Sequence, residues 1–85
     1  MIEKLNELNG WNFNAEKNAL EKEFQFKSYL KNIAFVNAVA WIANKDNHHP
    51  DLIVRYNTCK VILTTHDQGF VSQKDFDMAK KIDLL

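Results

Sequence analysis

Histidine is the residue type in this chain best suited to chemistry at neutral pH, and two of the three histidines are adjacent. His48 and His49 directly precede Pro50, the only proline. An imidazole has an ordinary pKa of about 6.5, so it can donate or accept a proton near neutral pH. Pro50 disfavours helical backbone at His49, so the pair should begin an extended or turn segment. The pattern predicts titratable side chains at the start of a strand.

The third histidine, His66, lies further along the chain, and the segments between predict how the three could meet. Residues 52–57 and 59–66 both alternate in a way that is typical of strands. Two short strands in succession should pair as a hairpin. Because a hairpin brings its open ends together, we expect His66 to return to the neighbourhood of His48 and His49.

The other segments complete an α+β domain. Ser28 can cap a long helix that runs to about Lys45, and Ser72 can cap a C-terminal helix in which Asp75 acts as a capping acid. A short first helix (2–8) and two strands (11–16 and 20–26) precede them. We therefore expect a single four-stranded antiparallel sheet with helices packed on one face, in the order α-β-β-α-β-β-α.

Size and composition indicate one domain over residues 1–85, with no net charge. That balance argues against direct nucleic-acid binding, and no segment is apolar enough for a membrane span or a signal peptide. Cys59 is the only cysteine, so we expect a reducing, cytoplasmic location. The long helix is apolar almost all round, interrupted only by Asn37, so we expect a second subunit to cover it in a homodimer or homotetramer.

Three interpretations of the histidines remain open on spacing alone. They can be ordinary surface groups beside a turn. They can bind zinc, which accepts three imidazoles and a water, although adjacent residues rarely ligate one ion with good angles. They can also serve as acid and base without a metal.

The order of polar residues resembles that of the pterin-4a-carbinolamine dehydratase family. The resemblance covers the chain from about Leu5 to Asp83. The polar positions that carry it are His48, His49, Pro50, Tyr56, Thr65, His66, Asp67, Ser72 and Asp75.

The resemblance implies a dehydratase that needs neither metal nor cofactor. Its small-molecule substrate would be a 4a-hydroxytetrahydropterin, which loses water to give a quinonoid dihydropterin. The family forms dimers and tetramers in which the helices pack centrally, which agrees with the apolar helix. The alternative is a weakly catalytic or non-catalytic scaffold of the same fold that binds pterin or serves in dimerisation.

The resemblance also assigns residues. It implies that His48, His49 and His66 are catalytic, with His48 and His66 near the leaving hydroxyl and His49 against the pterin ring. The positions expected to bind substrate are Asn44, Pro50, Asp51, Thr65 and Asp67.

Other family positions are expected to be structural. We expect Tyr56 either to pack under the site or to be an ordinary aromatic on the face of a strand. We expect Asp75 to stabilise the first turn of its helix rather than to contact a ligand. Two residues depart from the family pattern: Asn44 stands where a glutamate is common, and Phe70 stands where a glycine is usual.

Overall fold

The computed structural model describes residues 2–65, 67 and 70–85. Its elements follow the predicted order and confirm the predicted fold class. They are α1 (Ile2–Leu5), β1 (Asn12–Asn14), β2 (Ala19–Gln25), α2 (Tyr29–Asp46), β3 (Asp51–Val54), β4 (Thr58–Leu63) and α3 (Gln73–Asp83). No helix in this described part of the chain is both long and apolar enough to cross a membrane.

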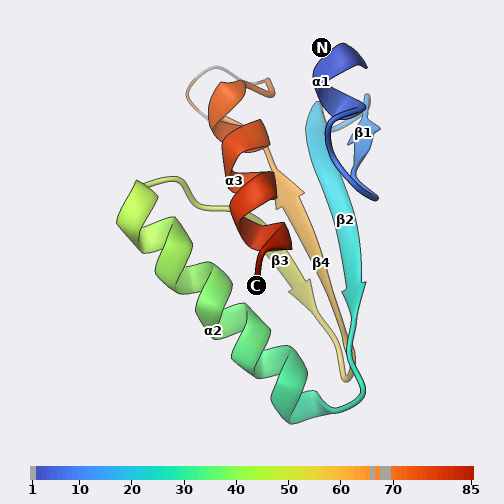
Figure 1. The fold of residues 1–85 in the computed structure, drawn as a ribbon, viewed down its shortest axis with the longest axis vertical. Coiled ribbons are helices and arrows are strands. Elements are labelled where there is room, and N and C mark those ends of the chain that lie inside the picture. The colour runs from blue at the N-terminus through green and yellow to red at the C-terminus, as the bar shows by residue number, and fades with distance from the viewer. Residues whose placement is uncertain (1, 66, 68–69) are drawn as a thin grey trace.

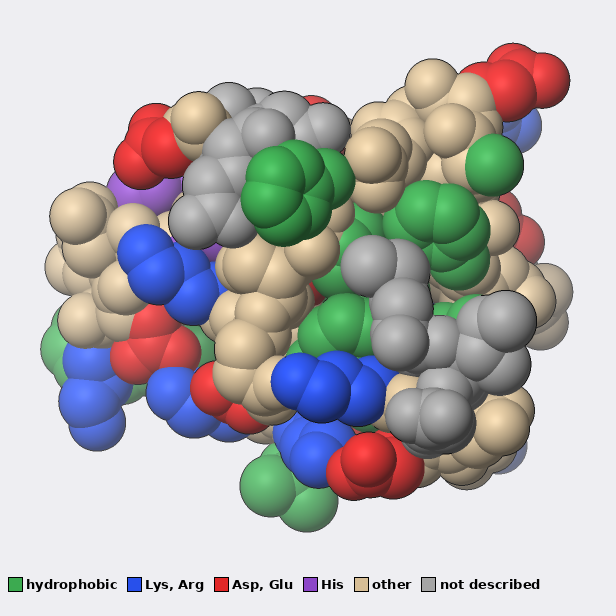
Figure 2. All heavy atoms as spheres, turned by 90° about the horizontal axis from the view of Figure 1, so that it is seen from above, with side chains coloured by type: hydrophobic (Ala, Val, Ile, Leu, Met, Phe, Trp, Pro, Cys, Tyr) green, Lys and Arg blue, Asp and Glu red, His purple; other side chains and the backbone are tan. Residues whose placement is uncertain are grey.

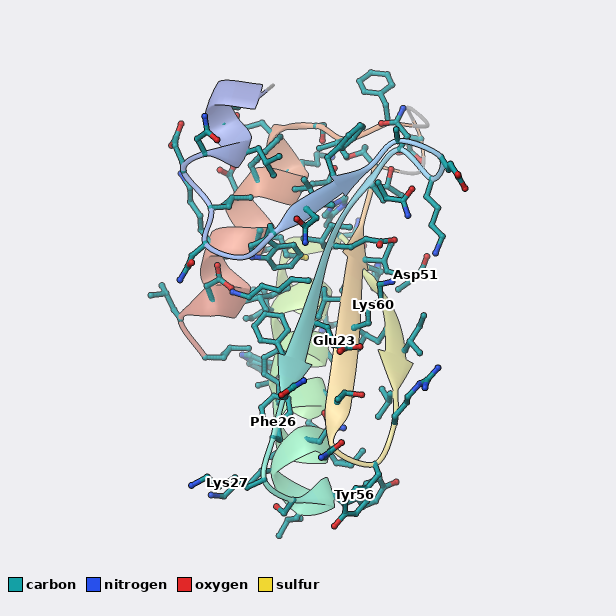
Figure 3. All side chains as sticks on the ribbon, turned by 90° about the vertical axis from the view of Figure 1, so that its right-hand side faces the viewer. Glu23, Phe26, Lys27, Asp51, Tyr56 and Lys60 are labelled. Atoms are coloured by element: carbon teal, nitrogen blue, oxygen red, sulfur yellow. The ribbon has the colours of Figure 1, made fainter. Side chains whose placement is uncertain are left out.

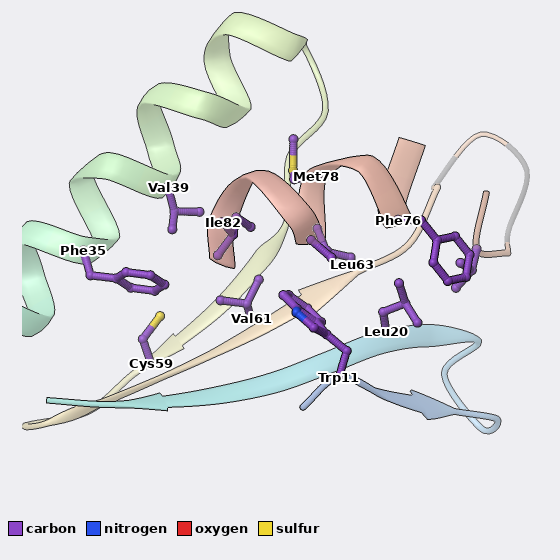
Figure 4. Packing of buried hydrophobic residues seen from close by; sticks show 12 residues of the cluster. Trp11, Leu20, Phe35, Val39, Cys59, Val61, Leu63, Phe76, Met78 and Ile82 are labelled. Atoms are coloured by element: carbon purple, nitrogen blue, oxygen red, sulfur yellow. The ribbon is translucent and has the colours of Figure 1, made fainter. Parts of the chain in front are cut away.

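The strands form one antiparallel sheet in the order β1-β2-β4-β3. Both α2 and α3 lie on the same face of this sheet (Figure 1). The space between them and the sheet is filled by buried side chains (Figure 4). The core cluster comprises Trp11, Leu20, Phe35, Val39, Cys59, Val61, Leu63, Val71, Phe76, Met78, Ala79 and Ile82. On the opposite face, polar side chains such as Glu23 and Lys60 point away from the helices (Figure 3).

The long helix begins where its capping residue predicts. The Oγ of Ser28 accepts a hydrogen bond from the backbone N–H of Lys31 at 3.1 Å, which satisfies one of the unpaired donors of the first turn. The buried positions of α2 form a single stripe at helical spacing: Asn32, Phe35, Val39 and Ala43. The opposite side of α2 leaves Leu30 78% and Trp41 72% exposed.

The first helix is shorter than predicted, because α1 ends at Leu5. The hydrogen bonds that follow are tighter turns, from the N–H of Glu7 to the carbonyl of Lys4 and from that of Leu8 to the carbonyl of Leu5. A helix of so few residues gains too little from propagation to offset its nucleation. Gly10 then takes a left-handed φ of 81°, which turns the chain into β1.

Lys22 is a charged residue on the core-facing side of β2, and its partners explain why it can lie there. Its Nζ donates to the carbonyl of Asn9 at 2.7 Å and to Asp83 Oδ1 at 2.9 Å. It also lies 4.8 Å from the centre of the Phe24 ring. The other oxygen of Asp83 accepts from the indole N–H of Trp11 at 3.0 Å. This cluster fastens the N-terminal loop to the end of α3.

Asn32 is a fully buried polar residue of α2 that sequence patterning did not single out. Its Nδ2 donates to the carbonyl of Arg55 at 2.8 Å and to the carbonyl of Thr58 at 2.9 Å. Arg55 lies in the turn between β3 and β4, and Thr58 is the first residue of β4. One side chain thus fixes the position of α2 relative to the β3–β4 hairpin.

We expect Asn32→Ala to lower the free energy of unfolding by roughly 1–3 kcal/mol, because two carbonyl groups lose their donor in a partly buried place. Urea denaturation followed by circular dichroism measures this change. Asn12→Ala is the matched control, since Asn12 is an exposed asparagine on β1. Equal stability of both variants would contradict the role of Asn32 as a clamp.

Candidate active site

The two adjacent histidines lie directly after the end of α2. Asn47 takes a left-handed φ of 51° there. The backbone N–H of His48 donates to the carbonyl of Ala43 at 3.1 Å and closes the helix end. Pro50 follows, and β3 begins at Asp51. The helix end thus fixes the backbone of His48 at the entrance to the hairpin.

The β3–β4 register brings distant residues together at the open end of the hairpin. Leu52 pairs with Val61 and Asp51 with Ile62, so the residues before β3 lie beside those after β4. A polar pocket of about 240 Å³ occupies this end, and we call it the polar pocket. Its lining residues are Asn47, His48, His49, Thr65, Asp67 and Lys74. Figure 2 looks onto the end of the molecule at which α3 begins and shows histidine at the surface beside acidic and basic side chains.

The two ends of the hairpin meet at the polar pocket, which His48, His49, Thr65 and Asp67 all line. The convergence of all three histidines stays a prediction. His66, the third predicted histidine, lies outside the described residues. Its neighbours in the chain, Thr65 and Asp67, both contribute to the pocket.

Asp75 has the predicted capping role and also belongs to the site. It is fully buried, and its Oδ1 lies 2.6 Å from the Nε2 of His48. Its Oδ2 accepts from the Thr65 hydroxyl at 2.7 Å and from the backbone N–H of Ser72 at 2.9 Å. The last bond is the predicted capping interaction. Because that bond alone accounts for an acid at this position, helix capping did not indicate the contact with His48, and the family pattern that includes both residues was the signal that pointed to it.

The two imidazoles have different surroundings. The side chain of His48 is 12% exposed and faces Asp75, whereas His49 is exposed and lines a second pocket as well. This second space, the apolar pocket, has a volume of about 410 Å³ and lies between α2 and β3. Its lining residues are Val39, Ala40, Ala43, Asn44, His49, Pro50 and Leu52. His49 therefore lies at the boundary of both pockets.

The remaining predicted site residues do not all line the polar pocket. Asn44 and Pro50 line the apolar pocket rather than the polar one. Asp51 is exposed at the start of β3 and belongs to the lining of neither pocket. The expectation that Tyr56 packs under the site is wrong, because Tyr56 lies in the β3–β4 turn at the opposite end of the hairpin (Figure 3). There it is 69% exposed and stacks on Tyr29.

The arrangement is suited to proton transfer. Two imidazoles, one of them hydrogen-bonded to a buried carboxylate, line one pocket. Cys59 does not offer a nucleophile here, because it is buried in β4 and burial raises the pKa of its thiol.

Comparison with known proteins places this geometry in a family. The family described as pterin 4 alpha carbinolamine dehydratase matches residues 1–85. A protein of Hydrogenovibrio crunogenus is 49% identical over 95% of this chain and 72% of its own length. One of Sulfolobus acidocaldarius is 44% identical over 94% of this chain and 86% of its own length. Both carry the name of candidate pterin-4-alpha-carbinolamine dehydratases.

Solved structures agree with this placement. A crystal structure from Brucella melitensis, described as a transcriptional coactivator/pterin dehydratase, superimposes with a TM-score of 0.94 at 33% identity, over 99% of this chain and 89% of that one. A pterin dehydratase-like protein described as a RuBisCO assembly factor of the alpha-carboxysome shares the fold, with a TM-score of 0.77 at 21% identity over 89% of this chain and 88% of that one. The chain belongs to the pterin 4 alpha carbinolamine dehydratase family.

Proposed function

We propose that this protein is a dehydratase that removes water from a 4a-hydroxytetrahydropterin to give a quinonoid dihydropterin. The observation that supports this proposal most directly is that His48 and His49 lie together in the polar pocket of a chain that belongs to this family. The small-molecule pterin substrate is what the family implies.

The elimination requires two proton transfers. The carbon–oxygen bond at C4a breaks as the hydroxyl takes up a proton, because hydroxide alone is a poor leaving group. The lone pair of the adjacent ring nitrogen forms the new double bond to C4a, and a proton bound to nitrogen is then lost. An imidazole can supply the first proton and accept the second, and such assistance is typically worth roughly 10²–10⁴-fold in rate.

We assign these transfers to the histidines. His49 is the exposed imidazole at the boundary of both pockets, which suits contact with the pterin ring. His48, which Asp75 orients, would act near the leaving hydroxyl. The family resemblance assigns His66 to the same place. The reaction as proposed uses no metal and no cofactor.

The two pockets suggest how the substrate would lie. A pterin has a flat bicyclic body with polar groups along its edges. The polar pocket offers Asp67 to ring N–H groups, and the adjoining apolar pocket, with Asn44 and Pro50, would take a less polar part of the molecule. Asp51 and Thr65 remain predicted substrate-binding positions, and the cytoplasmic location expected from the single cysteine is part of the proposal.

A scaffold role without catalysis is the second candidate. It is favoured by the Brucella structure, which is described as a coactivator as well as a dehydratase, and by the assembly factor that shares the fold. Asn44 in place of the common glutamate also removes one charged group from the neighbourhood of His49.

An activity assay separates the two candidates. The 4a-carbinolamine is generated in situ and formation of the quinonoid product is followed optically. We expect the intact protein to accelerate dehydration and His49→Ala to lower the enzymatic rate by roughly 10²–10⁴-fold, because a proton-transfer group is lost. Lys27→Ala is the control and should retain the rate, because Lys27 is exposed and lies just beyond the end of β2 (Figure 3). A wild-type rate equal to the uncatalysed background would favour the scaffold role.

Metal analysis of the active protein tests the metal-free mechanism.

We also propose that the protein is a homodimer or homotetramer in which the outer side of α2 is covered by another subunit. Leu30 and Trp41 are more than two-thirds exposed there, and Tyr29 is 55% exposed. Large apolar side chains that stay exposed on one side of a helix are typical of protein–protein interfaces.

Light scattering coupled to size-exclusion chromatography tests this assembly. We expect a mass that is a multiple of the 9.9 kDa chain, and a shift toward the single-chain mass when Leu30→Glu and Trp41→Glu are combined. Leu85→Glu introduces the same charge at an exposed leucine beyond α3 and should leave the mass unchanged. A wild-type mass of one chain at all concentrations would refute the oligomer.

A further inference from the structure

We propose that Asp75 is a positioning residue that holds the proton of His48 on Nε2, so that Nδ1 is the atom of this ring that exchanges protons with a ligand. The assignment of the proton rests on hydrogen-bond geometry alone. Its kinetic consequence rests on the proposed function.

The direction of the hydrogen bonds around Asp75 starts from a donor that cannot be reversed. The backbone N–H of Ser72 can only donate, and it lies 2.9 Å from Oδ2. This oxygen is therefore an acceptor. The Thr65 hydroxyl, at 2.7 Å from the same oxygen, donates to it as well.

A second hydroxyl group fixes the direction of the Thr65 bond. The Oγ of Ser72 lies 2.5 Å from the Oγ1 of Thr65. Thr65 has one hydroxyl proton, which it gives to Asp75, so Ser72 must donate to Thr65. Both hydroxyl protons thus run toward the carboxylate.

The remaining oxygen of Asp75 faces His48. An ionised carboxylate only accepts hydrogen bonds, so at 2.6 Å from Oδ1 the ring nitrogen Nε2 must carry the proton and donate it. Asp75 is fully buried, whereas the side chain of His48 keeps 12% exposure. The ring, and not the carboxylate, is thus the group that a ligand can reach. Among the described residues, Nδ1 has no hydrogen-bond partner.

The protein alone provides the first test. Two-bond ¹⁵N–¹H correlation spectra of ¹⁵N-histidine-labelled protein, recorded at a pH above the titration of the ring, distinguish a protonated from an unprotonated ring nitrogen. Comparison with His48→Gln assigns the resonances among the three histidines. We expect His48 as the Nε2–H tautomer. Finding the neutral ring protonated on Nδ1 would overturn the proposal without any reference to catalysis.

The variant Asp75→Asn should invert this tautomer. The N–H of Ser72 still requires an acceptor, so the amide oxygen must take the place of Oδ2 and the amide NH₂ group must face His48. That group donates, so Nε2 must accept and the ring proton moves to Nδ1. An Nε2–H ring that persists in folded Asp75→Asn would contradict the mechanism. Asp77→Asn makes the same chemical change at an exposed site of α3 and should leave the tautomer unchanged.

Kinetics provide a readout that a purely structural role would not give. We expect Asp75→Asn to lower kcat by roughly 10²-fold with little change in KM. Ligand binding is preserved, but Nδ1 of the neutral ring already carries a proton, and the carboxylate that stabilises the cationic, proton-donating ring is gone. Thr65→Val removes a hydrogen-bond donor to Asp75 and should also lower kcat. Thr65→Ser retains the hydroxyl and should keep the wild-type kcat. If Asp75→Asn does not fold, the tautomer of His48 in the wild type and the comparison of Thr65→Val with Thr65→Ser test the proposal instead. If the wild type shows Nε2–H but no dehydration, the proposed function fails and the proton assignment stands.

Discussion

The antiparallel pairing of β3 with β4 is the constraint on which the site depends. Pairing Val54 with Cys59 at one end of the hairpin and Asp51 with Ile62 at the other leaves no freedom in how the chain enters and leaves the sheet. A shift of one residue would turn Val61 out of the core, so burial of this side chain enforces the register. The polar pocket forms at the open end as a consequence. Its geometry is therefore set by the hydrophobic core.

Asp75 connects helix α3 to this end of the hairpin. A fully buried carboxylate is costly unless hydrogen bonds replace its lost hydration, and here three donors do so, from Ser72, Thr65 and His48. These donors come from the start of α3, the segment after β4 and the segment after α2. The carboxylate thus stabilises the fold only when the three segments are correctly placed, and the orientation of His48 is coupled to the packing of α3.

Sequence patterns predicted the elements because local rules govern them. Ser28 and Ser72 mark helix starts, and Asn18, with a left-handed φ of 52°, marks the turn between β1 and β2. The roles of the buried Asn32 and the half-buried Lys22 were not predicted, since each is decided by partners distant in the chain. Partners distant in the chain also limited what could be predicted about the site. Pairing of β3 with β4 places the polar pocket at the open end of the hairpin, but strand pairing does not determine which pocket a residue near the end of α2 lines.

The site combines one constrained and one accessible imidazole, and their order along the chain accounts for the difference. His48 still belongs to the closing turn of α2, through its N–H bond to Ala43, and this turn directs its ring toward α3 and Asp75. His49 comes one residue later, beside Pro50, and remains exposed between the polar and apolar pockets. A buried, hydrogen-bonded ring has a fixed orientation, which suits proton delivery to one point, whereas an exposed ring can adjust to a ligand that occupies both pockets. Adjacent residues of the same type can therefore perform different tasks, because the end of a helix places one of them inside the protein and the next outside.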